Sequence, residues 1–279
     1  MSAERASADG PAEATVLEFE GVELSFDHKV LDGVNFRMGA GETRVILGAA
    51  GSGKSVLLKV AIGLVPVDSG RVALLGEDIT GLEEKDLFAV RANVGVLFQE
   101  GGLFDSLTVG DNVAYPLENQ QARGLAPAEE VLRRVTEALR FVELEHTLEQ
   151  YPAELSGGMR RRVGIARAVV TEPPLVLYDS PTAGLDPITA NLIMALIAKE
   201  RDTKGAASLI VTHRYQDGQL MADFRYNSEQ GELVRASGDP SKEPRTIFMV
   251  MRDGQIVFEG DKTALEKSAD PYVRKFVRR

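Results

Sequence analysis

The most constraining feature of the chain is a glycine-rich stretch that joins an apolar run to a helix-forming run. Gly48 to Ser55 reads GAAGSGKS and directly follows Val45-Ile46-Leu47. In this G-x-x-x-x-G-K-S pattern, glycines let backbone N–H groups curl round a polyphosphate, and Lys54 adds a mobile charge. The pattern predicts phosphate binding, unless the glycines serve only the packing of a strand-to-helix turn. The candidate phosphate-binding residues are Gly48, Gly51, Ser52, Gly53, Lys54 and Ser55.

Composition narrows the class of protein. The chain has 279 residues, of which 44% are hydrophobic, enough for one large α/β domain or for two lobes. Its net charge of -10 argues against nucleic acid as a partner, because phosphate backbones require clustered Lys and Arg; only a local basic patch would escape this argument. The absence of Cys excludes disulfides and thiolate metal sites. No run approaches the ~18 apolar residues that span a bilayer, so membrane contact would go through a partner.

The order of patterns along the chain indicates several substructures. Residues 1–14 are small and polar with a Gly10-Pro11 breaker, which predicts a disordered tail. Apolar residues alternate from Val16 to Phe36, which predicts antiparallel strands before the phosphate loop. From Glu100 to about Val170, glycine-rich loops and helical periodicity predict a mainly helical subdomain.

The remainder of the chain returns to a sheet. The apolar runs 175–178 and 208–212 are separated by the helix-like segment 188–201, and strands that alternate with helices imply a parallel sheet. An Asp253-Gly254 turn between two apolar runs predicts a hairpin. Residues 262–277 predict a terminal helical stretch.

The most specific motif besides the phosphate loop is Leu155-Ser156-Gly157-Gly158-Met159. Ser156 would cap a helix, and Gly157 and Gly158 would leave its first N–H groups open to a phosphate; an ordinary Ser cap is the alternative. The segment resembles the signature of ATP-binding cassette (ABC) nucleotide hydrolases. With the other motifs in the same order, the chain is similar to this family over nearly all residues after Ala14.

The resemblance implies roles around a nucleotide. Gln99 would be the Q-loop glutamine that reaches Mg²⁺ and the γ-phosphate, unless it is a surface-turn residue. Asp179, which ends an apolar strand, would order Mg²⁺ near the Ser55 hydroxyl. Phe26 would stack on adenine, with a core or edge Phe as the alternative. His213 would bond the γ-phosphate, with a structural His as the alternative.

Several positions depart from the family. Ser180 stands where the family carries its catalytic glutamate, and general-base catalysis contributes about 10²–10⁴-fold. Hydrolysis is therefore slow, or another group such as His213 supports it, or the chain is adapted to hold ATP. Met159 replaces the usual Gln of the signature and cannot donate a hydrogen bond. The basic run 160–162 would assist an anionic ligand, form a solvated helix face or contact the phosphate-bearing lobe indirectly.

The resemblance also implies the fold and the assembly. The expected class is α/β, a P-loop NTPase (RecA-like) core with an antiparallel β subdomain and an inserted α-helical subdomain. The ABC domain would span 15–279, with the core in 15–99 and 171–279 and the helical subdomain in 100–170. In this family the signature of one subunit completes the phosphate loop of another. A homodimer is implied, with ATP and Mg²⁺ as cofactors and with Asp186 of the D-loop touching the second copy.

Strings within 97–117, 155–161 and 184–189 resemble the ATPase of MCE-type phospholipid transporters, a group that includes the maintenance-of-lipid-asymmetry (Mla) system. This implies an integral membrane permease and MCE-domain lipid-binding proteins as partners, at the cytoplasmic face of the inner membrane. The alternatives are an importer ATPase for another substrate and an ATP-binding clamp or regulatory subunit with little hydrolysis. A soluble ABC protein for DNA repair or translation is disfavoured by the single nucleotide-binding unit and the acidic charge. Residues 223–245 are extra relative to the family and would form a surface hairpin.

Overall fold

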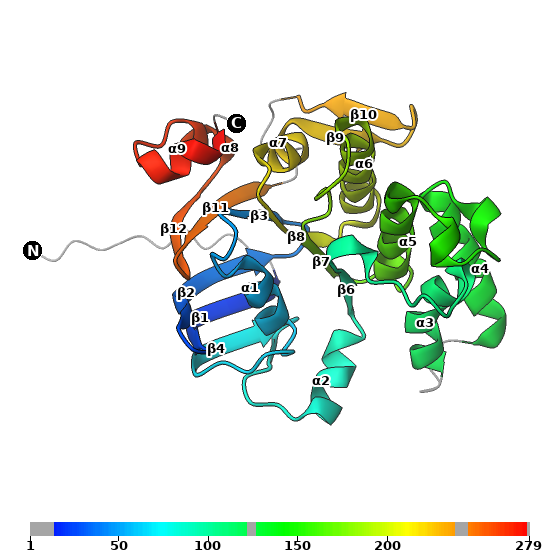
Figure 1. Ribbon diagram of the computed structural model, residues 1–279, viewed down its shortest axis with the longest axis horizontal. Helices are drawn as coiled ribbons and strands as arrows, with labels where there is room; N and C mark the ends of the chain where they lie inside the picture. The colour runs from blue at the N-terminus through cyan, green and yellow to red at the C-terminus, as the bar shows by residue number, and fades with distance from the viewer. Residues whose placement is uncertain (1–13, 122–126, 238–244, 278–279) are drawn as a thin grey trace, which may run out of the picture.

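A six-stranded sheet forms the centre of the molecule (Figure 1). Its strands lie in the order β12-β11-β3-β8-β7-β6. The computed structural model describes residues 14–121, 127–237 and 245–277. Its strands are β3 (Thr43–Gly48), β6 (Val94–Leu97), β7 (Leu175–Asp179), β8 (Ala207–Thr212), β11 (Thr246–Arg252) and β12 (Gln255–Gly260). Every neighbouring pair is parallel except β11 and β12, which form an antiparallel hairpin. The parallel sheet and the hairpin predicted from the sequence are both present.

A second, antiparallel sheet has the strand order β2-β1-β4-β5. Its strands are β1 (Thr15–Ser25), β2 (Lys29–Gly39), β4 (Ser69–Leu74) and β5 (Glu77–Asp78). Leu17 and Phe19 on β1 are buried, whereas the residues between and after them carry charge. This alternation of buried and charged residues is the pattern that predicts antiparallel strands in this part of the sequence.

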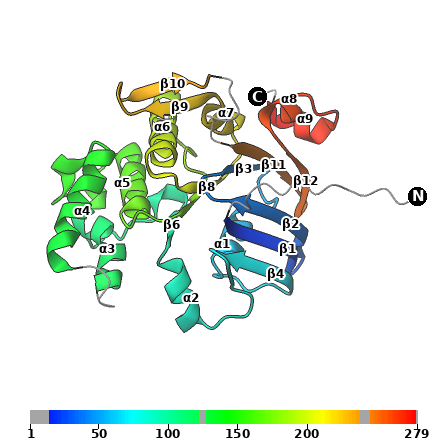
Figure 2. The ribbon, with the colours of Figure 1, turned by 180° about the vertical axis from the view of Figure 1, so that it is seen from behind.

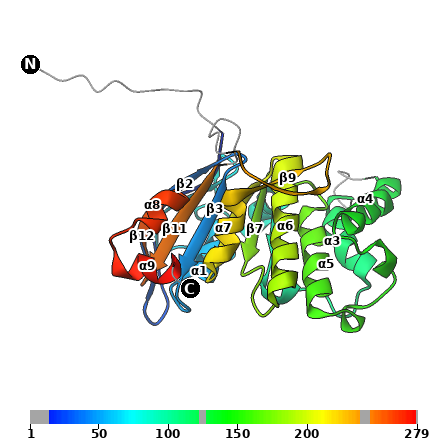
Figure 3. The same cartoon turned by 90° about the horizontal axis from the view of Figure 1, so that it is seen from above.

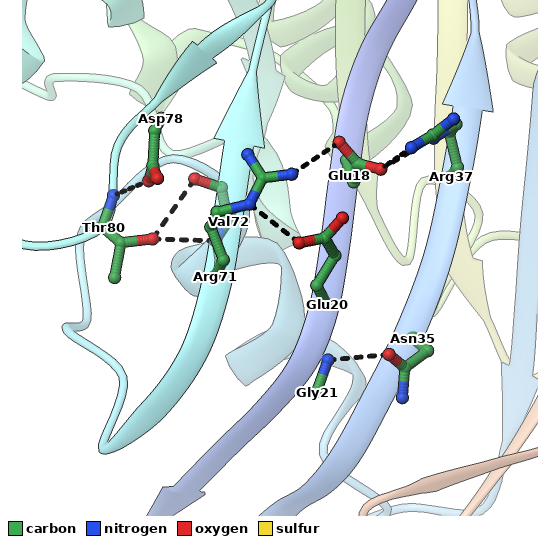
Figure 4. A network of polar contacts seen from close by, with 9 residues as sticks. All are labelled: Glu18, Glu20, Gly21, Asn35, Arg37, Arg71, Val72, Asp78 and Thr80. Atoms are coloured by element: carbon green, nitrogen blue, oxygen red, sulfur yellow. Dashed lines mark hydrogen bonds and ion pairs between the residues drawn. The ribbon is translucent and has the colours of Figure 1, made fainter.

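Ion pairs cross the outer face of the antiparallel sheet (Figure 4). Arg71 on β4 donates to Glu20 at 2.8 Å and to Glu18 at 3.0 Å. From the other side, Arg37 on β2 donates through its Nε to Glu18 at 2.7 Å. Glu18 on the central strand β1 therefore binds both neighbouring strands. Exposed pairs of this kind contribute little to stability, and their effect is to favour this strand register.

The two faces of the central sheet pack against different elements, because successive side chains of a strand point to opposite sides. One face packs against helix α1 (Lys54–Ala61) and the antiparallel sheet, through Ile46, Leu177, Val211 and Met249. The other face packs against helices, through Val176, Tyr178 and Ile210 in one cluster and Val45, Phe248 and Val250 in another. The carboxyl ends of the parallel strands are thereby fixed from both sides.

The helices that follow β6 lie at the end of the molecule opposite the antiparallel sheet (Figure 1). They are α3 (Val109–Gln121), α4 (Ala128–Phe141) and α5 (Gly157–Val169), and all fall within the segment 100–170 predicted to be helical. The other helices are α2 (Glu84–Arg91), α6 (Pro187–Lys204), α7 (Tyr215–Asp223), α8 (Lys262–Glu266) and α9 (Pro271–Val277). Within the described ranges, no helix combines the length and the apolar character needed to cross a membrane.

The terminal helical stretch predicted over 262–277 is present, but it is divided in two. The structure has two short helices, α8 and α9, which lie beside β11 and β12 (Figure 3). Pro271 begins the second helix, and the residue before a proline is disfavoured in helical conformation. Asp270 therefore ends any continuous helix and instead accepts a hydrogen bond from the Tyr272 backbone N–H at 2.7 Å.

The predicted surface hairpin is present in the described part of 223–245. β9 (Phe224–Asn227) and β10 (Glu232–Arg235) pair antiparallel next to α6 (Figure 2). Buried Arg201 on α6 anchors it by donating to the carbonyl oxygens of Met221 at 2.6 Å and Phe224 at 2.8 Å. The Tyr226 N–H donates to Asp202 at 2.7 Å. The tail predicted at 1–14 lies, except for its last residue, outside the described residues.

Glu200 is a buried acid on α6. Its side chain is 2% exposed, and within the described chain its Oε1 has no hydrogen-bond partner. Burial raises the pKa of Glu200 to about 7, against the lowering effect of Lys204. The same burial, together with the charge of Glu200, raises the pKa of Tyr178 on β7.

We expect this carboxyl group to make stability depend on pH. Since the folded chain keeps the Glu200 proton up to about pH 7 and the unfolded chain loses it near 4.5, the free energy of unfolding should fall by about 3 kcal/mol as pH rises through this window. Urea unfolding of Glu200→Gln should lack this fall, because the amide does not ionise. The exposed Glu229→Gln variant is the control, and parallel pH profiles for wild type and Glu200→Gln would contradict the prediction.

Candidate functional site

The phosphate loop, residues 48–55, requires glycine at two positions where backbones meet. A Cβ on Gly48 would lie 2.5 Å from Ser52 Oγ and 2.7 Å from the Met251 carbonyl oxygen. Gly53 has a φ of +101°, and a Cβ there would lie 2.7 Å from the Val30 carbonyl oxygen. Only glycine allows both the left-handed turn into α1 and the contact with the neighbouring strands. The packing of this turn therefore depends on both glycines.

Lys54 folds back over this loop. Its Nζ donates to the carbonyl oxygens of Gly48 at 2.9 Å and Ala49 at 2.7 Å, and to Ser52 Oγ at 3.2 Å. Burial lowers the pKa of Lys54, while the negative charge of Asp179 acts to raise it. The ammonium group thus satisfies loop carbonyls with bonds that an anionic ligand can replace.

A cavity of about 890 Å³ opens beside the loop. It brings together residues from distant parts of the sequence that were predicted as one site: Phe26, Gly51, Gly53, Lys54, Ser55, Gln99, Ser180 and His213. Gly48 and Ser52 belong to the loop but are not among the residues that line the cavity. Asp179 does not line it either, but accepts a hydrogen bond from the Oγ of the lining residue Ser180 at 3.0 Å. Phe26 is 60% exposed, so the alternative of a core phenylalanine is wrong.

The predicted signature lies outside this cavity. Ser156 caps α5, with its Oγ accepting a hydrogen bond from the Met159 N–H at 3.2 Å. Ser156 and Gly157 are exposed, and a Cβ on Gly157 would meet nothing within 4 Å. Met159 packs against the core of the helical region. The chain therefore presents an open helix start and a phosphate loop at separate places.

Ser180 has an unusual backbone that neighbouring elements hold in place. Its φ is 50°, a left-handed value that is uncommon outside glycine. Its N–H donates to the Val211 carbonyl oxygen at 2.9 Å, which ties it to β8. Arg161 of α5 donates to the carbonyl oxygens of Ser180 at 3.4 Å and Ala183 at 3.1 Å. The position after Asp179 is fixed by backbone contacts that do not depend on its side chain.

These contacts correct the interpretation of the basic run 160–162. Arg161 is 4% exposed, and Arg162 donates to the Val142 carbonyl oxygen at 3.0 Å. Of these three arginines only Arg160 is exposed. The interpretation of the run as a solvated helix face is therefore wrong for Arg161 and Arg162. A run of three charges gives no sign of which member is buried, because that depends on the helix face packed against the sheet.

Sequence reasoning also missed Asp217, which joins two loops of the site. Its side chain is 2% exposed, and its Oδ2 accepts hydrogen bonds from Thr182 and Thr212, each at 2.7 Å. Thr182 belongs to the D-loop segment 181–186, and Thr212 precedes His213. Burial raises the pKa of Asp217, while the two hydroxyls act to lower it. The only signal in the sequence is an acidic residue one helical turn after His213.

Asp186 and Ile188 mark an exposed helix start at the end of the D-loop. Asp186 caps α6, with its Oδ1 accepting from the N–H groups of Ile188 and Thr189 at 3.0 Å. The bonds from Thr189 and Ile188 lower the pKa of Asp186. Ile188 is 83% exposed, an unusual position for a large apolar side chain.

Comparison with known proteins agrees with this geometry. The family model described as ABC transporter matches residues 31–183, which is more than half of the chain. The chain belongs to the ABC transporter family. The resemblance to ABC proteins predicted from the motifs is confirmed.

Two curated relatives show how far the similarity to this ABC protein extends. The methionine import ATP-binding protein MetN of Corynebacterium diphtheriae is 39% identical over 225 residues, which cover 79% of this chain and 65% of the relative. The probable ribonucleotide transport ATP-binding protein mkl of Mycobacterium tuberculosis (strain ATCC 25618 / H37Rv) is 33% identical over 274 residues, which cover 98% of this chain and 69% of the relative. Neither name mentions phospholipid, so the MCE/Mla branch stays a prediction.

Solved ABC structures share the fold. The dimeric ATP-binding cassette MJ0796, in a post-hydrolysis state bound to ADP and Pi, has a TM-score of 0.72 at 29% identity and covers 88% of this chain and 98% of its own. The structure of cbiO1 from Clostridium perfringens, part of an ABC transporter complex, has a TM-score of 0.74 at 27% identity and covers 95% of both chains. The predicted α/β class with a P-loop NTPase core is confirmed.

The Asp217 bridge predicts a coupling between Thr182 and Thr212. Each Thr→Val variant should lower the free energy of unfolding by about 1–2 kcal/mol, because a hydrogen bond to a buried charged group is lost. The double variant should cost more than the sum, because it leaves the carboxylate without either hydroxyl. Urea unfolding of all four proteins measures this difference.

Thr203 supplies the matched control for this cycle, since its hydroxyl donates to the Lys199 carbonyl oxygen of its own helix at 2.7 Å. Thr203→Val combined with Thr212→Val should be additive. Additivity of the Thr182 and Thr212 pair as well would show that Asp217 does not couple the two loops.

Proposed function

We propose that this chain is the ATP-binding and ATP-hydrolysing subunit of a membrane transporter and that it works as a homodimer. The observation that carries the proposal is the convergence of Lys54, Ser55, Gln99 and His213 on one cavity, in a chain of the ABC family. The peripheral position, at the cytoplasmic face of the inner membrane, would be held by a permease.

The residues present fit ATP and Mg²⁺. The loop glycines that exclude any Cβ bring backbone N–H groups to the cavity, and Lys54 offers a charge to the phosphates. The Ser55 hydroxyl, the Gln99 amide and the Asp179 carboxylate would hold Mg²⁺, which prefers oxygen ligands. When bound, Mg²⁺ neutralises charge on the transferred phosphate. His213, which also lines the cavity, would bond the terminal phosphate.

The separation of signature and phosphate loop supports the homodimer. Ser156 and Gly157 are exposed away from the cavity of their own chain, and only a second copy would bring such a helix start to the bound phosphates. The exposed Ile188, next to Asp186, is an apolar group suited to that interface. The similar cassette MJ0796 is dimeric.

A second cavity supports contact with a permease. About 460 Å³ in volume, it lies between the segment 88–98 and α3. Four aromatic residues line it and are 40–46% exposed: Phe88, Phe98, Phe104 and Tyr115. Exposed aromatic groups gathered in a groove are typical of helix-docking sites. We infer that an apolar helical segment of the permease binds here.

Arg167 joins this groove to the Q-loop. It donates from α5 to the carbonyl oxygens of Gly101 at 3.0 Å and Gly102 at 2.8 Å, and its guanidinium lies 5.6 Å from the centre of the Phe104 ring. Gln99 begins the same turn. Movement of Gln99 toward a bound nucleotide would therefore also displace residues of the groove, through the contacts of Arg167 with the Gly101 and Gly102 carbonyls and the Phe104 ring.

The transported substrate is proposed from sequence strings alone. The resemblance of 97–117 and 184–189 to MCE-type ATPases favours glycerophospholipid or another hydrophobic substrate, with MCE-domain proteins as further partners. Methionine and ribonucleotide, which the names of the relatives mention, are the competing substrates.

The transporter purified with its membrane partners tests the proposal. Lys54→Ala should abolish ATP turnover and the movement of labelled phospholipid between vesicles, because the phosphates lose their mobile cation. Lys59→Ala, an exposed lysine on the same helix, should change neither. Retention of turnover by Lys54→Ala would contradict the ATPase proposal, whereas transport of methionine or ribonucleotide in place of lipid would contradict only the lipid branch.

The same preparation tests the groove. Phe104→Glu should lose copurification of the polytopic membrane protein while it keeps ATP binding, because a charge would enter the apolar contact. Leu132→Glu is the control, since Leu132 is 62% exposed on α4 and does not line the groove. Equal copurification by both variants would place the permease elsewhere.

Ser180 favours a second candidate function, an ATP-binding clamp or regulatory subunit with little hydrolysis. Its hydroxyl proton is directed to Asp179, so it is a donor where a general base would have to accept a proton. Ser180→Glu should raise ATP turnover by about 10²-fold or more, the usual contribution of a general base. Steady-state phosphate release measures this. A fast wild type that gains nothing from the substitution would rule out the clamp.

A further inference from the structure

The last described helix, α9, forms a wall of the nucleotide cavity that no motif accounts for. Tyr272, Lys275 and Phe276 line the cavity together with Phe26 and the phosphate loop. They are about one helical turn apart, which puts the three side chains on one face of α9. Arg274, on the same helix, is exposed but does not line the cavity.

Tyr272 connects α9 to the start of the phosphate loop. Its hydroxyl oxygen accepts a hydrogen bond from the Ala49 N–H at 3.4 Å, and the hydroxyl donates to the Met251 carbonyl oxygen at 3.2 Å. The Met251 carbonyl is also the group that excludes a Cβ at Gly48. One phenol therefore holds the helix, the loop and the end of β11 together.

The body of α9 is fixed to the sheet on its other face. Val273 is fully buried, in a cluster that includes Leu265, Phe248 and Val250. Tyr272 and Phe276 contact each other edge to face, with ring centres 5.3 Å apart. This packing orients the cavity face of α9 before any ligand binds.

Positive charge on the cavity face of α9 favours an anionic ligand. Lys275 is an exposed cation at the cavity, with its Nζ 5.9 Å from the centre of the Tyr272 ring. The guanidinium of Arg252 lies 5.3 Å from the centre of the same ring. Among the groups of a nucleotide, the phosphates are the anions that such cations attract.

We propose that α9 belongs to the nucleotide site of its own chain, with Lys275 as a second cation for the phosphates beside Lys54 and with Tyr272 as a positioning residue that couples the helix to the phosphate loop. The ligand class is a nucleoside di- or triphosphate. The inference rests on the proposed function of the cavity as the nucleotide site, and it adds a binding element more than 200 residues away from the loop in sequence.

Calorimetric titration of the full chain with Mg·ATP tests the role of Lys275. Lys275→Gln should weaken binding about three- to tenfold, the loss expected for one charge-assisted contact. Adenosine, which has no phosphate, should bind both proteins equally. Arg274→Gln is the matched control and should bind ATP as the wild type does. Equal effects of the two variants, or no effect of Lys275→Gln, would overturn the proposal.

Lys54→Ala separates this inference from the proposed function. If Lys54→Ala leaves ATP affinity unchanged, the cavity is not the nucleotide site and both ideas fail. If Lys54→Ala weakens ATP binding and Lys275→Gln does not, only the role of α9 is wrong.

Hydrogen exchange tests the coupling through Tyr272. ATP should slow amide exchange in the peptide 271–277 of the wild type, because the ligand would seat α9 against the loop. In Tyr272→Phe, the Ala49 amide should exchange faster and the effect of ATP on 271–277 should shrink. Unchanged exchange of 271–277 on ATP addition to the wild type would overturn the coupling, and unchanged exchange at Ala49 in the variant would remove Tyr272 from it.

Discussion

The close approach of backbones at Gly48 and Gly53 is the constraint on which the rest of the site depends. β3 lies between β11 and β8, and its end can turn into α1 only because no side chain stands at either glycine. The loop N–H groups, the Lys54 ammonium and the Ser55 hydroxyl then face a single cavity. Any side chain at these glycines would meet the neighbouring backbone and change the shape of the loop.

Around this loop, buried polar side chains fix the segments that leave the other strands. Asp217 joins the D-loop to the end of β8, Arg161 joins α5 to the turn at Ser180, and Arg167 joins α5 to the Q-loop. Each bonds to hydroxyls or backbone carbonyls of irregular segments, which have few ladder bonds of their own. α5 thus contacts both the turn at Ser180 and the Q-loop segment, through Arg161 and Arg167.

Motifs and patterns predicted a large part of this arrangement. The G-x-x-x-x-G-K-S loop, the alternation through Phe36 and the apolar runs before Asp179 and His213 each give a local signal, and the structure places those residues as expected. The predicted terminal helical stretch is present as two helices, because Pro271 begins a new helix. The burial of Arg161 was missed because charge alone does not reveal which helix face packs inward.

What the sequence determined by itself was the family, the α/β class and the identity of half of the residues that line the cavity, because phosphate loops and helix caps are local structures with their own residue patterns. The tertiary structure alone decided that Asp217 bonds two separate threonines, that Ser180 directs its hydroxyl to Asp179, and that α9 lies against the loop. The contact of Asp217 with Thr182 and the contact of α9 with the loop join segments that are distant in the chain. Which residues meet in these contacts depends on how helices and loops pack on the two faces of the central sheet. No short pattern of residues predicts that packing.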